Sequence, residues 1–261
     1  MESDKVLEIE NLSTAFQIGG KPVAVTKDIS FDIRRGEILG IVGESGSGKS
    51  VTAKTVMRLL PTPPSSVLSG TIALNGVELL NLSEREMEKI RGNKVAMIFQ
   101  EPMTALNPVY TCGDQIVEVV RKHQKLSKKA AREAALEMLK LVGIPMPEQR
   151  MKAYPHELSG GQLQRVCIAR AVACEPEIIL FDEAISSLDA HTQVQVMDLL
   201  IDLKEKLNLT YVFITHDLTS VTYLCDEVLF LYRGHITECR PVRELGKTTD
   251  EYARRLLQAI V

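Results

Sequence analysis

The chain has 261 residues, 45% of them hydrophobic and 25% charged, a balance typical of water-soluble globular proteins that are long enough to bury a large core. Its formal net charge is -3 and its basic residues are scattered, which argues against a nucleic-acid partner. No apolar run approaches membrane-spanning length, and the run at 228–232 has the length of a strand. None of the five cysteines belongs to a C-x-x-C pair, so we expect reduced thiols, most of them buried.

The first part of the chain predicts two strands and then a strand, loop and helix. Segments 6–10 and 29–33 alternate between apolar and polar residues, as half-buried strands do. A continuous apolar strand is expected at 38–42, and a helix-compatible stretch covers 51–60. The prolines at 61–64 end that helix, because proline removes a backbone donor.

Three further short elements follow. Residues 71–79 carry Asn-Gly between two apolar runs, the strongest short signal for a hairpin with a tight turn. Ser83 and Glu86 form a capping box at the start of a helix. Residues 95–99 predict another short apolar strand.

The second half of the chain changes from mainly helical to alternating strands and helices. Residues 101–174 look helical, and the apolar face between 131 and 142 ends at Gly143. Strand-like runs then return at 178–181, 211–214 and 228–231. Strands that alternate with helices, such as 192–207, imply a largely parallel sheet.

These elements predict one domain over residues 1–261 of the α/β class. We expect a nucleotide-binding lobe with a parallel core sheet and an N-terminal antiparallel β portion, formed by 1–100 and 175–240. A helical subdomain, 101–174, is inserted into this lobe, and 241–261 forms a short C-terminal helical tail.

Residues 43–50 match the phosphate-binding pattern G-x-x-x-x-G-K-[ST] at every fixed position, and the flanking strand and helix supply the required context. Glycines let the backbone turn its N–H groups towards phosphate oxygens. We expect Lys49 to reach the β- and γ-phosphates and Ser50 to bind Mg²⁺. The alternative is a glycine-rich turn without a ligand. The predicted nucleotide contacts are Gly43, Glu44, Ser45, Gly46, Ser47, Gly48, Lys49, Ser50 and Val51.

A second chemical signal is the pair of acids that ends the strand at 178–181. Asp182 is placed to hold Mg²⁺, and Glu183 is placed to polarise a water molecule for attack on the γ-phosphate. Alone, this pattern also fits a buried strand ending in surface carboxylates. The phosphate motif upstream favours the catalytic interpretation.

The third signal is Leu-Ser-Gly-Gly-Gln at 158–162, directly before a helix-like run. Exposed N–H groups at a helix start form an anion site, and one nucleotide does not need two such loops from distant segments. We therefore expect a dimer in which each chain's second loop caps the nucleotide held by the other chain. A plain Gly-Gly helix cap is the alternative. The residues of this loop are Ser159, Gly160, Gly161 and Gln162.

In this order, the three signals resemble the ABC-type ATPase family over residues 5–260. The resemblance implies hydrolysis of ATP with Mg²⁺ by two chains that close face to face. It also implies roles for single residues. Gln100 resembles the Q-loop glutamine that touches Mg²⁺ or the attacking water, and Asp189 resembles the D-loop aspartate at the dimer seam. His216 resembles the switch histidine that contacts the γ-phosphate. Phe16 lies where the family stacks an aromatic ring on adenine, although it also suits a core position.

The sequence departs from the family pattern after the catalytic glutamate. Ala184 and Ile185 replace the usual Pro and Thr between the acids and Asp189. Because both acids remain, we expect hydrolysis to be retained.

Two stretches resemble one branch of the family. Residues 97–108 and 43–52 are similar to the ATPase subunits of bacterial oligopeptide, dipeptide and nickel importers. The chain ends soon after the segment 251–257 and carries no cysteines there for an iron–sulfur cluster. This short end is more similar to the nickel or metallophore importers, so the transported substrate stays open among peptides, nickel and metallophores.

The resemblance also implies partners. The insertion and the neighbourhood of Glu101 and Pro102 would form the groove that receives a permease helix. The complex would contain two transmembrane permease subunits, with the ATPase at the cytoplasmic face of the inner membrane. A second ATPase subunit, identical or paralogous, would complete the dimer, and an extracytoplasmic substrate-binding protein would act indirectly.

Two rival functions fit the sequence less well. A soluble ABC ATPase acting on ribosomes or DNA usually carries two ATPase domains or a long coiled coil, whereas this chain has one phosphate loop and ordinary helical sequence. A P-loop kinase or GTPase is disfavoured by the segment 158–162 and by the lack of an Asn-Lys-x-Asp motif.

Overall fold

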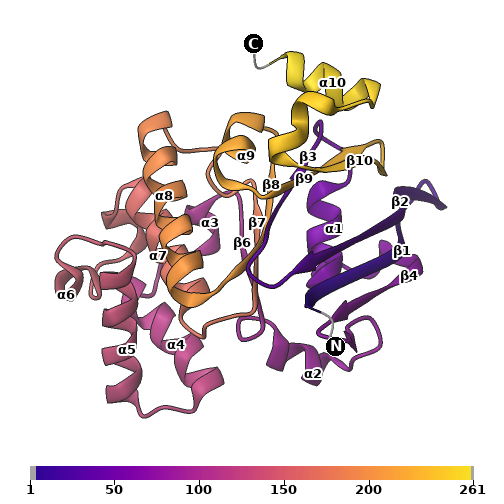
Figure 1. Ribbon diagram of the computed structural model, residues 1–261. Helices are drawn as coiled ribbons and strands as arrows, with labels where there is room; N and C mark the ends of the chain where they lie inside the picture. Colours follow the sequence, from indigo (N-terminus) through magenta and orange to yellow (C-terminus); the bar gives the residue numbers. More distant parts are fainter. Residues whose placement is uncertain (1–3, 260–261) are drawn as a thin grey trace. The chain divides into compact units, whose positions relative to one another are not determined.

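The computed structural model (Figure 1) describes residues 4–259. These residues fall into two compact units. The first unit contains the chain up to Met87 and again from Thr210, and the second contains Glu88–Leu209. The last two residues of the predicted tail lie outside the described range. Among the described residues, no helix has the length and apolar character needed to cross a bilayer.

An antiparallel sheet begins the first unit, with strand order β2-β1-β4-β5. Asn75 and Gly76 both have positive φ, 46° and 76°, which confirms the predicted tight hairpin between β4 and β5. Strands β1 and β2 are much longer than their predicted segments, because register shifts interrupt the alternation of apolar and polar residues. The strands are β1 Lys5–Ile18, β2 Lys21–Arg34, β4 Ser65–Leu74 and β5 Val77–Glu78.

The other strands of the first unit include β3, which leads directly into the phosphate motif. Strand β3 pairs in parallel with β8 and with β9, and β10 pairs antiparallel with β9. The strands are β3 Ile38–Val42, β8 Thr210–Thr215, β9 Glu227–Tyr232 and β10 His235–Pro241. The helices are α1 Lys49–Val56, α9 Leu218–Leu224, the 3₁₀ helix η2 Val242–Lys247 and α10 Glu251–Gln258.

Helix α1 ends earlier than the sequence predicted. It stops at Val56, well before the prolines, because Arg58 adopts a left-handed φ of 49°. The N–H of Leu59 then bonds to the carbonyl of Lys54 at 2.8 Å, which closes the helix. The Arg58 guanidinium donates to the carbonyl oxygens of Leu79 and Leu82, so contacts from outside the helix accompany its end.

The second unit contains two parallel strands and most of the helices. Helices α4 and α5 pack side by side (Figure 1), and α7 is the most buried helix in this unit. The elements are β6 Val95–Ile98, α3 Pro102–Ala105, α4 Cys112–Gln124, α5 Lys128–Leu141, α6 Pro147–Arg150, η1 Pro155–Glu157, α7 Gly160–Val172, β7 Ile178–Asp182 and α8 Ala190–Leu207.

Helix α2, Glu84–Ile90, carries the chain from the first unit into the second. The Ser83 N–H donates to Glu86 Oε2 at 2.8 Å and the Glu86 N–H donates to Ser83 Oγ at 3.4 Å. These bonds confirm the predicted capping box. Parallel strands, an antiparallel β portion and a helical part are all present, which confirms the predicted fold class.

Candidate functional site

The phosphate loop follows a strand whose five residues are all buried. The backbone requires glycine at two positions. A Cβ on Gly43 would lie 2.2 Å from the Leu231 carbonyl oxygen, and Gly48 has a φ of 107°. Residues with side chains rarely adopt such a φ. The motif glycines therefore let the loop lie directly against the end of β9.

Lys49 is the charged centre of this loop. Its side chain is only 4% exposed, and its Nζ donates to the carbonyl oxygens of Gly43 at 2.7 Å and Glu44 at 3.0 Å. Ser47 is equally buried, and its hydroxyl has no hydrogen-bond partner. A buried hydroxyl without a partner is costly unless a ligand satisfies it. The loop thus offers a buried cation and an unsatisfied donor, as an anionic phosphate requires.

Neighbouring segments of the first unit support the loop backbone. The Gly234 N–H, in the turn after β9, donates to the Ser47 carbonyl at 3.0 Å, and the Gly234 carbonyl accepts from the Lys27 N–H at 2.8 Å. The hydroxyl of Tyr252, on α10, accepts a hydrogen bond from the Glu44 N–H at 2.8 Å. Sequence reasoning missed Gly234 and Tyr252, because no local pattern links them to the loop.

Two other predicted residues lie in the first unit. Val42 and Thr215 are register partners in the parallel pair β3–β8, so His216 leaves the sheet at the same edge as the phosphate loop. His216 is exposed, so its side chain is accessible to a ligand. Phe16 is half-buried on β1, where it pairs with Val23 and Ser65.

The predicted acids lie together with Gln100 in the second unit. Strands β6 and β7 run parallel with Ile98 opposite Phe181, so the residues after both strands emerge at the same edge. The Gln100 Nε2 donates to Glu183 Oε2 at 3.3 Å. Asp182, at the end of the buried strand, is 5% exposed. The structure thus brings together Gln100 and Glu183, which were predicted from separate motifs.

Glu183 has an unusual backbone. Its φ is 50°, a left-handed conformation that costs a residue with a side chain about 1–3 kcal/mol and is concentrated at functional sites. Its carbonyl oxygen accepts hydrogen bonds from Ser186 Oγ at 2.8 Å and from the Ser186 N–H at 3.2 Å. Ala184 and Ile185, the departures from the family pattern, are buried. The turn after the acids is therefore packed and hydrogen-bonded without the usual Pro and Thr.

The second predicted anion loop forms the start of α7. Ser159 caps this helix: its Oγ accepts from the Gln162 N–H at 3.4 Å, and the Ser159 N–H donates to Gln162 Oε1 at 3.3 Å. Ser159 and Gly160 are exposed. The loop therefore presents the amino end of a 13-residue helix, where a negative charge is stabilised. Its exposure is compatible with a ligand carried by another chain.

Asp189 caps the next long helix, α8. Its carboxylate accepts from the Thr192 N–H at 3.0 Å and from Thr192 Oγ1 at 2.6 Å. The bond from the Thr192 side chain is the main cause that holds the pKa of Asp189 below its ordinary value. A Cβ on Gly161 would lie 2.7 Å from Thr192 Cγ2, so the second loop and the Asp189 turn are packed against one another.

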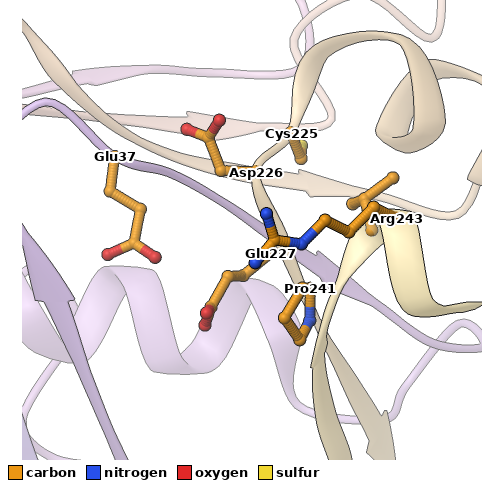
Figure 2. Close-up of a pocket in the computed structure, with 7 residues that line it drawn as sticks. Glu37, Cys225, Asp226, Glu227, Pro241 and Arg243 are labelled. Carbon is orange, nitrogen blue, oxygen red and sulfur yellow. The ribbon is translucent and has the colours of Figure 1, made fainter.

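A separate cavity of about 500 Å³ lies at the start of β3 (Figure 2), whereas the phosphate loop follows the end of this strand. Two of its carboxylates hold backbone: Asp226 Oδ2 accepts from the Ile38 N–H at 2.9 Å and Glu37 Oε2 accepts from the Arg34 N–H at 2.8 Å. Burial, followed by the charges of Glu227 and Asp226, raises the pKa of Glu37. Glu37 and Asp226 therefore have structural roles in holding the backbone.

A family model described as ABC transporter matches residues 26–186. The chain belongs to the ABC transporter family. The oligopeptide transport ATP-binding protein OppD of Bacillus subtilis (strain 168) is 46% identical over 241 residues, which cover 92% of this chain and 67% of that protein. The dipeptide transport ATP-binding protein DppD of the same organism is 46% identical over 235 residues, covering 90% and 70%. OppD of Escherichia coli (strain K12) is 42% identical over 260 residues, covering 99% and 77%.

Solved structures agree with this membership. The ATP-binding cassette MJ0796, solved as a dimer in a post-hydrolysis state with ADP and Pi, superposes with a TM-score of 0.80 at 29% identity, covering 91% of this chain and 99% of that one. The family model, the relatives and this solved cassette together show that the present chain binds and hydrolyses ATP, as the motifs predicted. The interpretations as a kinase, a GTPase or a non-transport ATPase are not supported.

Proposed function

We propose that this ABC ATPase is the nucleotide-binding subunit of an importer that takes up peptides. The observation that carries the proposal is the phosphate loop, with its buried Lys49 and the partnerless Ser47 hydroxyl, in a chain whose relatives are named oligopeptide and dipeptide transport ATP-binding proteins. The short stretch at 97–108, which ATP chemistry does not demand, supports the same branch. Nickel uptake is a family-level alternative.

In this proposal the loop, with Val51 after it, holds the phosphates of ATP while Phe16 stacks on the adenine. Lys49 exchanges its carbonyl partners for the β- and γ-phosphates, so a buried cation gains an anionic partner. His216 contacts the γ-phosphate from the neighbouring strand end.

Glu183 is the proposed general base, which takes a proton from the attacking water. Its hydrogen bond with Gln100 gives the carboxylate a defined position before substrate binds, and Gln100 can then orient the water. This arrangement supports the assignment of both residues to the hydrolytic step, because a base must lie within hydrogen-bond reach of the proton that it removes.

Mg²⁺ is the proposed cofactor, and the residues that would hold it are Ser50, Gln100 and Asp182. Hydroxyl, amide and carboxylate oxygens are the donors that Mg²⁺ prefers, usually with phosphate oxygens and water. Among residues 4–259 no group of three or more His, Cys, Asp or Glu side chains could hold a metal ion. When bound, Mg²⁺ would neutralise charge on the phosphates.

We further propose that two ATPase subunits, identical or paralogous, close over two ATP molecules. Ser159, Gly160, Gly161 and Gln162 of one subunit would cap the nucleotide held by the other, and Asp189 would lie at the seam. The exposed amino end of α7 supports this arrangement, and the MJ0796 cassette is a dimer. ATP would drive closure because it binds the closed form more tightly than the open one.

The subunit would act at the cytoplasmic face of the inner membrane, bound to two transmembrane permease subunits. The predicted groove near Glu101 and Pro102 has exposed apolar side chains nearby: Met103, Val109 and Tyr110 are 50%, 72% and 56% exposed. Exposed apolar residues that cluster along the chain are typical of an interaction surface. An extracytoplasmic substrate-binding protein would deliver the substrate to the permease.

Substitution of the base tests the chemistry. We expect Glu183→Gln to bind ATP as well as the unmodified protein but to release phosphate at least about 100-fold more slowly, because general-base catalysis contributes about 10²–10⁴-fold. ATP should then trap a closed dimer, visible by size-exclusion chromatography. Glu177→Gln is the matched control, since Glu177 pairs with Lys94 before the same strand. Phosphate release by Glu183→Gln at the normal rate would contradict the assignment of the base.

The transport role needs the whole complex. A tagged chain should co-purify with its permease subunits from the native cells, and ATP hydrolysis by the reconstituted complex should rise when a peptide-loaded binding protein is added. Stimulation by a nickel-loaded binding protein and by none of the peptides would exclude peptide import. The chemical proposal would be unaffected by that result.

A further inference from the structure

The C-terminal helix contacts the phosphate loop through one side chain. Tyr252 lies in the first turn of α10, and its hydroxyl oxygen accepts the N–H of Glu44 at 2.8 Å. The two residues are 208 positions apart in the chain and belong to the same unit. Tyr252 is 9% exposed, and the hydrogen bond to the exposed residue Glu44 is partly buried.

The same peptide group is held at both of its ends. The Glu44 N–H and the Gly43 carbonyl belong to one planar peptide, and the Gly43 oxygen accepts a hydrogen bond from Lys49 Nζ at 2.7 Å. Tyr252, this peptide and Lys49 thus form a chain of hydrogen bonds in which each bond polarises the next. Together with the Glu44 carbonyl oxygen, the second acceptor of Lys49, this peptide sets where the ammonium group lies before ATP binds.

The tyrosine is itself fixed in place. Its ring lies 4.3 Å from the ring of Tyr232 between centroids, at an interplanar angle of 31°, and the guanidinium of Arg233 lies 5.0 Å from the centre of the Tyr232 ring. At the start of α10 the Asp250 carboxylate accepts the Ala253 N–H at 2.9 Å. Burial raises the pKa of the Tyr252 hydroxyl above its ordinary value.

We propose that Tyr252 is a positioning residue for ATP binding. Its hydroxyl holds the Gly43–Glu44 peptide in the orientation that leaves the later N–H groups of the loop and the Lys49 ammonium directed at phosphate. This inference rests on the proposed role of Lys49. Because the Glu44 N–H donates to Tyr252, Glu44 shapes the loop and its N–H does not donate to the nucleotide. The C-terminal helix is therefore a component of the nucleotide site.

Tyr252→Phe tests the proposal, because it removes the hydroxyl and keeps the ring. A hydrogen bond of this kind, when lost, changes an equilibrium by about 3- to 10-fold. We expect the dissociation constant of ATP and the KM to rise by about that factor, with kcat within about twofold. Amide hydrogen exchange of Glu44 in the ATP-free protein should become faster. Tyr223→Phe is the matched control, since this tyrosine of α9 is 50% exposed.

The outcomes are separable from those of the proposed function. If the unmodified protein fails to bind ATP, or Lys49→Ala binds it normally, the proposed function itself fails. If the unmodified protein binds ATP and Tyr252→Phe binds it equally well, the Tyr252 hydrogen bond only attaches helix α10 to the rest of the first unit. A lower melting temperature with unchanged ATP affinity has the same meaning. Unchanged exchange of the Glu44 amide would also overturn the positioning role.

Discussion

The contact between the second loop and the Asp189 turn makes a sharp prediction for Gly161→Ala. The added methyl carbon would lie 2.7 Å from Thr192 Cγ2, far inside the separation of about 3.5–4.0 Å that two carbons prefer. Thr192 cannot turn away freely, because its N–H and its hydroxyl both bond to the Asp189 carboxylate. Either the two helix starts separate or the cap at Asp189 breaks.

The size of the effect follows from these alternatives. Overpacking costs about 1–3 kcal/mol, and loss of a cap costs about 1 kcal/mol. Replacing glycine by alanine inside a helix returns up to about 1 kcal/mol. We expect Gly161→Ala to lose about 1 kcal/mol in free energy of unfolding. Gly160→Ala is the matched control, because its methyl would lie 3.7 Å from Leu188 Cδ2, an ordinary contact, and should be neutral or slightly stabilising.

A second substitution decides whether the methyl contact is the cause. Thr192→Ser removes Cγ2 and keeps the hydroxyl that bonds to Asp189, so Gly161→Ala should be tolerated in that background. Urea unfolding of the two single variants and the double variant should give a coupling of about 1 kcal/mol between the two positions. Additive losses, or a Gly161→Ala protein as stable as the Gly160→Ala protein, would refute the reasoning.

Two further substitutions in the first unit give independent checks. Gly43→Ala should lose about 3 kcal/mol or more of stability, because its methyl would lie 2.2 Å from the Leu231 carbonyl oxygen, a backbone atom that cannot rotate away; a melting temperature within 1 °C or so of the unmodified protein would contradict this. Glu37→Gln tests a titration: burial raises the pKa of Glu37 in the folded protein, so the folded form loses stability as the pH rises past the ordinary value towards the raised one. The free energy of unfolding of the variant, relative to that of the unmodified protein, should therefore increase between about pH 4, near the ordinary carboxyl pKa, and about pH 7.5. An equal difference between the two proteins at both pH values would exclude the titration.

Much of the local structure followed from short patterns. Asn75 and Gly76 form the predicted hairpin, and the Ser83–Glu86 capping box is present. The phosphate motif is flanked by the expected strand and helix. Each pattern works because the interacting groups are within a few residues of one another, where geometry is almost independent of the rest of the fold.

Other features could not be predicted in this way. Helix α1 ends at Val56 because Arg58 turns into a left-handed conformation, where its side chain bonds to backbone beyond the helix. The left-handed φ of Glu183 could not be predicted from the sequence either, since nothing in an Asp-Glu pair requires it.

By itself the sequence determined the chemistry of this protein, because a phosphate loop, an acid pair and a helix start are each built from neighbouring residues. Only the tertiary structure decided how that chemistry is supported. It brought Gln100 within hydrogen-bond distance of Glu183, and the Tyr252 hydroxyl within hydrogen-bond distance of the phosphate loop. Both contacts join residues that are 83 and 208 positions apart, and such pairs meet only after the strands have paired and the helices have packed, so no local pattern records them.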